Sequence, residues 1–472
     1  MDGAVVTTGG QSVTSVLWFR RDLRLADHPA LLAAHDEGEV LPLVVLEPGQ
    51  VDDERPPAQR LRRSLAALHR ATGGALVVRV GDPVDLVGRA AEAVGADRVH
   101  VTRDTTPEGR ERDAAVADEL TAAGRELVTT GSPCAVGPGL VRTGEGTPYK
   151  VFTPFARAWR DHGWPEPAGR PDVEWSRVHA EQLDGLGDDG LPAVLAAADE
   201  EAVDGPAGEE AALERWRTFL DDDLADYDTA RDRPDLDATS RISVHLTHGE
   251  IHPRTMLADL AAHHDGDREG AQRFVTELAW REFYGDVLWH HPESAWQDLR
   301  DALAHLPYDE GPETDRLVAA WREGRTGYPF VDAGMRQLAA QGWMHNRVRM
   351  VVASFLTKDL HVWWPVGARH FLDHLVDGDL ASNSHGWQWV AGTGTDAAPY
   401  FRVFNPVRQG ERFDPDGDYV RRWVPELAHL PGATAHTPWD HDEGYAHGYP
   451  QRVVDHAEER REALDRYERT RA

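Results

Sequence analysis

The sequence predicts an α/β N-terminal domain with a parallel, Rossmann-like sheet, followed by a larger all-α domain. Three observations predict this order. The chain has 472 residues, which is more than one typical hydrophobic core organises. Its N-terminal part, up to residue 135, alternates short apolar runs with alanine-rich amphipathic stretches, as strands joined by helices do. From about residue 206 the pattern is helical almost throughout, with aromatic and arginine residues interleaved.

The elements of the N-terminal domain follow from this alternation. The predicted strands are Val13–Phe19, Leu41–Leu46, Ala75–Val80, Val99–Thr102 and Leu127–Thr130, with helices over Arg60–Thr72 and Pro83–Val94. The glycine fingerprint of dinucleotide-binding folds does not follow the first strand, which runs instead into Arg20, Arg21, Asp22, Leu23 and Arg24. The sheet therefore need not bind a dinucleotide.

The domain boundaries follow the changes in composition. Residues 1–135 are assigned to the α/β domain. Residues 136–205, rich in Gly, Pro, Asp and Glu, are assigned to a long connection with some local helix. Residues 206–472 form the predicted helical domain, and its tail, from Ala457 to Arg471, is expected to be a charged, solvated helix.

The net charge of −31 argues against loose binding of nucleic acid over the whole surface. The charge is not uniform, however. Residues 321–412 contain ten Arg or Lys and eight Asp or Glu, a net charge of +2, whereas the other 380 residues carry −33. This distribution fits a phosphate-facing site on an acidic protein, and it also fits a region that is simply more buried. Composition leaves both explanations open.

The single cysteine, Cys134, excludes an internal disulfide framework and any multi-cysteine metal site, and we expect it to be a small buried side chain. We expect no metal site. No stretch approaches the run of about 18 apolar residues that spans a membrane. The N-terminus also lacks the pattern of a signal peptide. The expected location is the cytoplasm, without membrane contact.

Four irregular segments concentrate the residues that can carry chemistry. They combine acids, amides, arginines and several of the 16 tryptophans, whose indole rings can stack on bases or flavins and pass electrons. Ordinary helix packing explains any one segment but not their joint occurrence. The segments are Glu277–Tyr284, Trp343–Met350, Asp377–Trp389 and Thr393–Arg402.

Together these segments resemble the DNA photolyase and cryptochrome family, and most closely its class I cyclobutane pyrimidine dimer photolyases. The resemblance spans nearly the whole chain and is strongest from Glu277 to Arg412. Further matches are Trp18–Leu25, Tyr149–Phe155 and Thr239–Arg241. The resemblance implies an N-terminal α/β domain joined to a helical domain that holds FAD bent into a U shape.

The resemblance also implies which residues hold FAD. Arg349 beside Asp377 matches a charge-balanced cradle for the reduced flavin anion, and Asn383 matches the residue that faces flavin N5. The remaining matches to the cofactor site are Tyr227, Thr239, Ser240, Arg241, Ser243, Phe274, Arg281, Asn346 and Asp379. Phe274 stands where the family often has Trp.

A lesion must leave the DNA helix to reach the flavin and needs aromatic walls to receive it. Trp280 and Trp389 match the two indoles that pack against the flipped dimer. Glu277 matches the carboxyl group that bonds the thymine edge, and Met350 matches the residue typical of dimer photolyases. Arg347 and Arg402 are candidates for phosphate contacts, and the alternative is a solvated surface pair.

The family reduces its flavin through a chain of three tryptophans. Trp387 matches the innermost ring and Trp364 the middle ring. The outermost position falls on Tyr308, where the family usually has Trp, and a tyrosine must release its phenolic proton when it is oxidised. We expect Tyr308 to be the terminal donor. The alternative is that all three rings are packing residues and that cellular reductants reduce the flavin.

The second, light-harvesting chromophore is left open by the sequence. Folate-binding relatives place an acid next to an amide before an Arg-x-Arg-Asp run. Here Glu108 and Gly109 precede Arg110–Asp113. A deazaflavin, a folate or no antenna chromophore are all consistent with these residues.

The predicted function is light-driven repair of cyclobutane pyrimidine dimers, an enzymatic lyase reaction on damaged DNA, by a protein that is expected to be monomeric. A cryptochrome-type photoreceptor without repair activity is the main alternative. Asn383, Glu277, Met350 and the pair Trp280 and Trp389 favour repair, and the short tail after residue 430 disfavours signalling. A flavin protein that binds DNA or another partner without catalysis is a third hypothesis.

Overall fold

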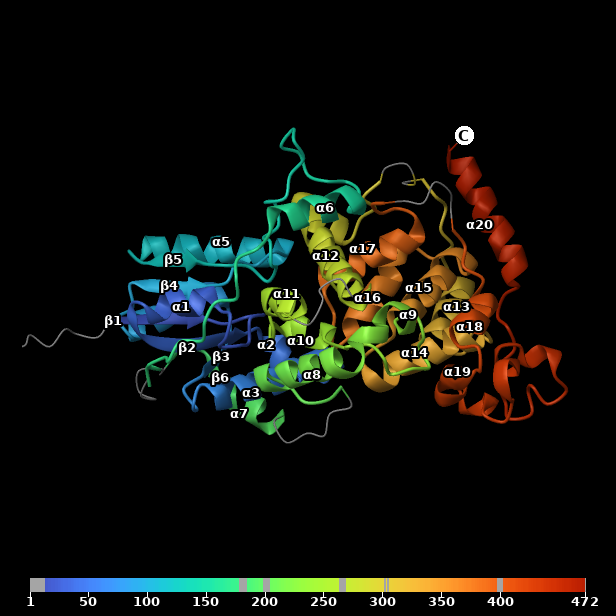
Figure 1. Ribbon diagram of the computed structural model, residues 1–472, viewed down its shortest axis with the longest axis horizontal. Helices are drawn as coiled ribbons and strands as arrows, with labels where there is room; N and C mark the ends of the chain where they lie inside the picture. The colour runs from blue at the N-terminus through green and yellow to red at the C-terminus, as the bar shows by residue number, and fades with distance from the viewer. Residues whose placement is uncertain are drawn as a thin grey trace, which may run out of the picture.

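The computed structural model describes residues 13–177, 185–197, 204–262, 269–300, 303, 305–396 and 402–471. Figure 1 shows a sheet covered by helices on one side of the molecule and a helical domain on the other. This confirms the predicted fold class. Within the described ranges, no helix has both the length and the apolar content to cross a lipid bilayer.

The sheet has the strand order β5-β4-β1-β2-β3-β6. All neighbouring pairs are parallel except β3 with β6. The second strand begins at Gly38 rather than at Leu41, because β1 pairs with Gly38–Leu43 and β3 pairs with Leu43–Leu46. The strands are β1 (Val13–Trp18), β2 (Gly38–Leu46), β3 (Val77–Val80), β4 (Arg98–Val101), β5 (Glu126–Thr129) and β6 (Asp188–Asp189).

Helices cover both faces of the sheet because the strand side chains alternate. In β1, Val16 and Trp18 pack with Val87 of α4 and with α5, whereas Leu17 packs in a second core cluster with α1 and with Leu65 of α3. The helices of this domain are α1 (Pro29–His35), α2 (Pro48–Val51), α3 (Pro56–Ala71), α4 (Pro83–Ala93) and α5 (Pro107–Ala122).

The segment expected to be a connection contributes elements to both domains. Helix α6 (Phe152–His162) packs on α12 of the helical domain. Helix α7 (Leu191–Ala196) packs on α3, with Val194 in the core of the α/β domain, and β6 adds an antiparallel edge to the sheet. Two acidic residues make a weak strand signal, so the sequence did not predict β6.

The helical domain is built around two large core clusters, one centred on α12 and one on α14–α17. Its α-helices are α8 (Glu209–Asp222), α9 (Tyr227–Ala230), α10 (Ser243–His248), α11 (Pro253–Ala262), α12 (Glu269–His290), α13 (Pro312–Arg322), α14 (Pro329–Gln341), α15 (Asn346–Ser354), α16 (Trp364–His374), α17 (Leu380–Ala391), α18 (Pro406–Phe413), α19 (Asp418–Trp423) and α20 (His456–Arg471). A π-helix, η6 (Phe355–Asp359), follows α15, and short 3₁₀ helices are η3 (Leu224–Asp226), η4 (Pro292–Ala295), η7 (Pro425–Leu427), η8 (Gly432–His436) and η9 (Pro438–Asp440).

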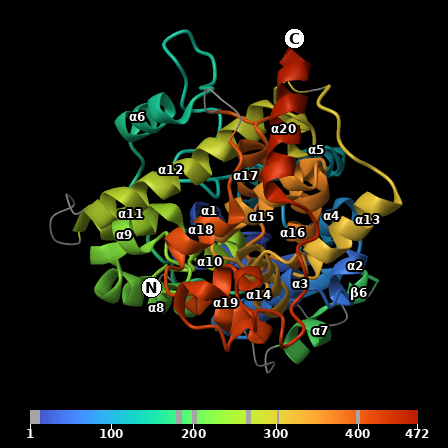
Figure 2. The same ribbon diagram turned by 90° about the vertical axis from the view of Figure 1, so that its right-hand side faces the viewer.

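The C-terminal helix α20 packs against the helical domain along one face (Figures 1 and 2). It is therefore less solvated than the sequence predicted. Arg466 bonds Asp309 at 2.8 Å and the carbonyl oxygen of Pro307 at 3.1 Å. Glu459 bonds His361 at 2.8 Å, just after the π-helix. These contacts hold the segment that contains Tyr308 against the domain.

The run after the first strand joins the two domains. Arg24 is buried and donates to the carbonyl oxygen of Gly249 at 3.0 Å. Gly249 has φ +65, and a side chain there would overlap the backbone at Arg21. The run from Arg20 to Arg24, which stands where dinucleotide-binding folds have a glycine-rich loop, therefore forms part of the domain interface.

Candidate active site

The helical domain contains a cavity of about 850 Å³, which lies at the upper end of the range for small-molecule and cofactor sites. It is lined mainly by the segment from Thr239 to Ser243 and by residues of α12, α15 and α17. Every predicted cofactor-site and lesion-site residue lines this cavity. Of the predicted relay residues, Trp387 lines it and Trp364 and Tyr308 do not.

One end of the cavity carries the predicted charge-balanced cradle. Arg349 donates to both carboxylate oxygens of Asp377, at 3.0 and 2.8 Å, and to the carbonyl oxygen of Met344 at 2.7 Å. Ser243 donates its hydroxyl to Asp377 at 2.8 Å. Asp377 is buried, and its negative charge is balanced by that of Arg349. The ion pair therefore has a fixed geometry and can lie next to a charged ligand without adding net charge.

The neighbouring segment is held by a residue that the sequence did not single out. Arg215 of α8 donates to the carbonyl oxygens of Ser240 at 2.7 Å and Thr239 at 3.3 Å. Arg241 takes a positive φ of +49, lies 4.4 Å over the ring of Trp343 and pairs with Asp237 at 3.0 Å. These contacts fix two hydroxyl groups at the cavity wall.

His345 presents a donor that has no partner in the part of the chain that the structure describes. Its Nδ1 accepts the backbone N–H of Arg347 at 3.2 Å, which caps α15, so the proton of the neutral ring is on Nε2. Burial lowers the pKa of His345 to about 4 and keeps the ring neutral. Among the described residues nothing accepts from the buried Nε2, which a bound ligand or water must therefore satisfy.

The cavity fits FAD by this chemistry. It offers hydroxyl donors and a buried ion pair for a pyrophosphate and a flavin, and the unpaired donor of His345. Flat apolar walls come from Phe274 and Trp387, both of which are buried. Asn383 donates its side-chain amide to the carbonyl oxygen of Ala368 at 3.0 Å, which fixes its orientation at the wall.

At the mouth, the predicted lesion carboxyl group is already paired. Glu277 forms an ion pair with Arg231, which the sequence analysis did not identify. Burial lowers the pKa of Arg231, but the Glu277 carboxylate outweighs it and the net pKa is raised. Trp280 has one face covered by Phe152, stacked at 3.6 Å, so only its other face and its edge are available to a ligand.

The two candidate phosphate contacts differ from each other. Arg347 pairs with Asp232 at 2.8 Å and lies 4.3 Å over the ring of Phe413, so it is not a free surface cation. Arg402 is exposed and lies 6.0 Å over the ring of Trp389. The thioether of Met350 is within 3.8 Å of Arg347.

Comparison with known proteins identifies the family. Residues 15–172 match the family model for DNA photolyase, and residues 274–469 match the model for the FAD binding domain of DNA photolyase. A deoxyribodipyrimidine photo-lyase of Streptomyces griseus is 42% identical over 97% of this chain and 99% of its own length. The chain belongs to the DNA photolyase family.

Two solved photolyases have the same fold. A bacterial class III photolyase from Agrobacterium tumefaciens is 36% identical, with a TM-score of 0.85 and 99% of both chains covered. An archaeal photolyase from Sulfolobus tokodaii, described with two FAD molecules, is 29% identical, with a TM-score of 0.81 and coverage of 97% of this chain and 100% of the other. The expected family is confirmed, whereas the expected subdivision into class I stays a prediction.

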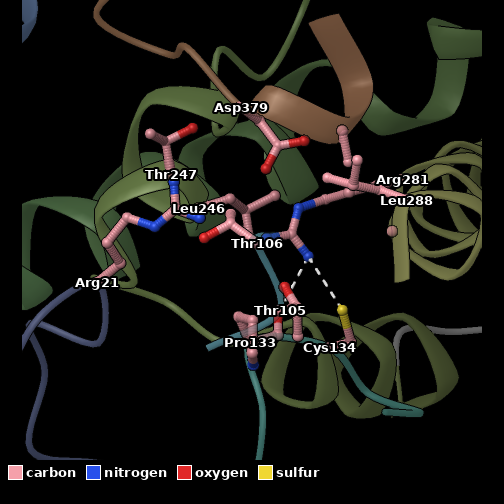
Figure 3. A pocket seen from close by; sticks show the side chains of 12 residues that line it. Arg21, Thr105, Thr106, Pro133, Cys134, Leu246, Thr247, Arg281, Leu288 and Asp379 are labelled. Atoms are coloured by element: carbon pink, nitrogen blue, oxygen red, sulfur yellow. Dashed lines mark hydrogen bonds between the residues drawn. The ribbon is translucent and has the colours of Figure 1, made fainter. Parts of the chain in front are cut away.

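In this photolyase, Arg281 lies between the cofactor cavity and the domain interface. It also lines a chamber of about 30 Å³, enough for one or two water molecules, together with Arg21 and Thr106 of the α/β domain (Figure 3). Its guanidinium donates to the carbonyl oxygen of Pro133 at 3.0 Å and lies 4.0 Å from the sulfur of Cys134. Cys134 is buried, and burial strongly raises its pKa, so it is an inert thiol.

The predicted relay residues lie on α17, at the start of α16 and in the segment before α13. Trp387 packs on Gly367, where a methyl group would overlap its ring, and Gly367 lies one turn after Trp364 on α16. Trp364 is fully buried and donates to Asp298 at 2.7 Å. The hydroxyl of Tyr308 is buried and has no partner among the described residues.

Proposed function

We propose that this protein splits cyclobutane pyrimidine dimers in DNA with light. The observation that supports this most is that one cavity is lined both by mostly buried residues, which we call its inner zone, and by partly exposed residues, which we call its mouth. The inner zone has the ion pair, hydroxyl groups and flat walls that suit FAD. The mouth has a carboxylate, two indoles and a thioether that suit a flipped-out pyrimidine dimer.

Bound FAD supplies, in its reduced and excited form, the electron that opens the cyclobutane ring. The protein supplies position and electrostatics. The pair of Arg349 and Asp377, of which Asp377 is buried, holds balancing charge next to the cofactor. Asn383, fixed by Ala368, presents an uncharged amide to the cofactor.

The mouth residues receive the lesion. The free face of Trp280 and the ring of Trp389 offer stacking surface in place of the base stack. Only the neutral carboxyl group of Glu277 can donate a hydrogen bond to the lesion edge as negative charge develops there, and this requires its ion pair with Arg231 to open. Arg231 is therefore a positioning residue for Glu277.

Damaged DNA meets a local field that differs from that of the whole acidic protein. Arg402 is exposed at the mouth, and Arg347 and Arg349 are close by in the same wall although each is paired with an aspartate. Phosphate contacts of this kind position the duplex, while the cavity selects the lesion. We further propose that the protein acts as a monomer in the cytoplasm.

For the antenna chromophore, the three alternatives to be tested are a deazaflavin, a folate and none. In the segment that differs from the folate-binding relatives, Asp104 fills the space beside Gly109. The guanidinium of Arg110 lies 3.9 Å over the ring of Trp289. The absorption spectrum of the purified protein, and extraction of its chromophores, tests this. A second chromophore besides FAD supports an antenna, and FAD alone contradicts it.

The repair assay tests the main proposal. The protein is purified in the dark, its flavin is reduced, and it is mixed with an oligonucleotide that contains one dimer. We expect blue light to remove the dimer and the dark control to retain it. A protein that binds FAD and changes its flavin spectrum in light but leaves the dimer intact would instead be a cryptochrome-type photoreceptor.

A further inference from the structure

Two neighbouring tryptophans share one carboxylate at the surface of the helical domain. Trp364 donates its indole N–H to Asp298 at 2.7 Å, and Trp363 donates to the same oxygen atom at 3.4 Å. Their rings are 6.5 Å apart, edge to face. Trp364 is fully buried, whereas Trp363 is 39% exposed.

This pair lies at the start of α16, the helix on which the ring of Trp387 packs at the cofactor cavity. Trp387 lines the cavity and packs on Gly367, one turn along α16 from Trp364. Helices α16 and α17 lie side by side (Figure 2). The order Trp387, Trp364, Trp363 therefore leads from the cavity wall through the core to solvent.

The other candidates for the outer end are less suitable. The hydroxyl of Tyr308 is buried and has no hydrogen-bond acceptor among the described residues. Burial and the charge of Asp298 both raise the pKa of Tyr308, so loss of its proton on oxidation is disfavoured. Trp321 is fully buried. The face of Trp296 is covered by the guanidinium of Arg369 at 3.9 Å, which disfavours a positive charge on that ring.

We propose that Trp363 is the surface end of the electron path into the flavin and that Asp298 holds it there. The proposal rests on the proposed function, because the oxidant is the excited, oxidised flavin. One electron leaves Trp387 for the flavin, one passes from Trp364 to Trp387, and one from Trp363 to Trp364. The positive charge then lies on Trp363, and an external thiol returns the missing electron. No covalent bond of the protein forms or breaks.

Asp298 stabilises this outer position electrostatically. A carboxylate in contact with two indole N–H groups lowers the energy of a positive charge on either ring and so disfavours its return toward the cavity. A tryptophan radical cation is a much weaker acid than a tyrosine radical cation, so it can keep its proton while its N–H is bonded to Asp298. The same carboxylate disfavours ionisation of the nearby Tyr308.

Transient absorption of the oxidised, FAD-loaded protein tests the proposal. Trp363→Phe should shorten the lifetime of the separated charges at least about tenfold and slow photoreduction by an external thiol. Asp298→Asn, which keeps an acceptor oxygen but removes the charge, should shorten the lifetime as well. Trp296→Phe is the matched control and should behave like the wild type.

A conservative variant separates electron transfer from packing. Trp363→Tyr restores an oxidisable ring that must lose its proton, so photoreduction should recover in part and become slower in heavy water and sensitive to pH. A wild-type lifetime in Trp363→Phe overturns the proposal, as does a larger effect of Tyr308→Phe. Repair by chemically reduced protein is measured in parallel, and its failure in the wild type would contradict the proposed function instead.

Discussion

Replacing Glu277 tests the lesion mouth directly. The side chain of Glu277 is 30% exposed and its partner Arg231 is 14% exposed, so a hydrogen bond that the neutral carboxyl group donates to a developing anion is partly shielded from water. A charge-assisted bond in such a place contributes about 2 kcal/mol, which corresponds to roughly 30-fold in the rate of the productive step. The repair yield falls by a smaller factor, because this step competes with return of the electron.

The assay for Glu277→Ala is the number of dimers removed per absorbed photon, with the flavin chemically reduced beforehand. FAD content should be unchanged, because Glu277 is paired with Arg231, whereas Ser243 and Arg349 hold Asp377. Glu269→Ala, an exposed acid at the start of the same helix, is the matched control. A wild-type quantum yield in Glu277→Ala would refute the assignment of this carboxyl group.

Three further predictions concern stability and DNA binding. Burial raises the pKa of Glu250, but its interactions with His245 and Arg60 outweigh burial and lower the pKa from 4.5 to about 2. The carboxylate therefore contributes roughly 3 kcal/mol above pH ~4.5 that is lost as the pH falls toward ~2, and Glu250→Gln should flatten the dependence of Tm on pH in that window. Dimer-containing DNA should bind with a shallow slope of log K against log[salt], roughly −2 to −3, and Arg402→Ala should reduce the size of this slope by about 1. A failure to bind at every salt concentration, with FAD intact, would contradict a DNA substrate. Glu282→Gln should cost about 2 kcal/mol in thermal unfolding but leave the repair yield per bound FAD unchanged, and the reverse result would place Glu282 in the chemistry.

The sequence predicted the features that local patterns encode. Alternating apolar runs gave the parallel strands, with ends that shift by a few residues, such as β3 starting at Val77 rather than at Ala75. The motif segments led to the residues that line the cavity, because those segments lie on helices that converge there. The role of each residue at that site is still a prediction.

Other features depend on contacts between distant segments, which no local pattern reports. Arg231 lies in a short, unremarkable stretch, and only the fold brings it to Glu277. The same holds for Arg215, which supports the segment at Ser240 from another helix. Trp363 is the residue next to the expected Trp364, and its importance depends on exposure, which the sequence does not show.

Helix α12 shows why one segment of sequence can carry both the fold and the site. Residues three or four apart share a face of a helix, and Glu277, Trp280 and Tyr284 all line the cavity. Glu282 points away from that face and accepts from the backbone N–H groups of Ala135 and Val136 and from the indole of Trp159. One face of α12 is thus bonded to the segment after β5 through Glu282, and the other face lines the cavity with Glu277, Trp280 and Tyr284. The geometry of the mouth therefore depends on the docking of the two domains as much as on the residues that line it.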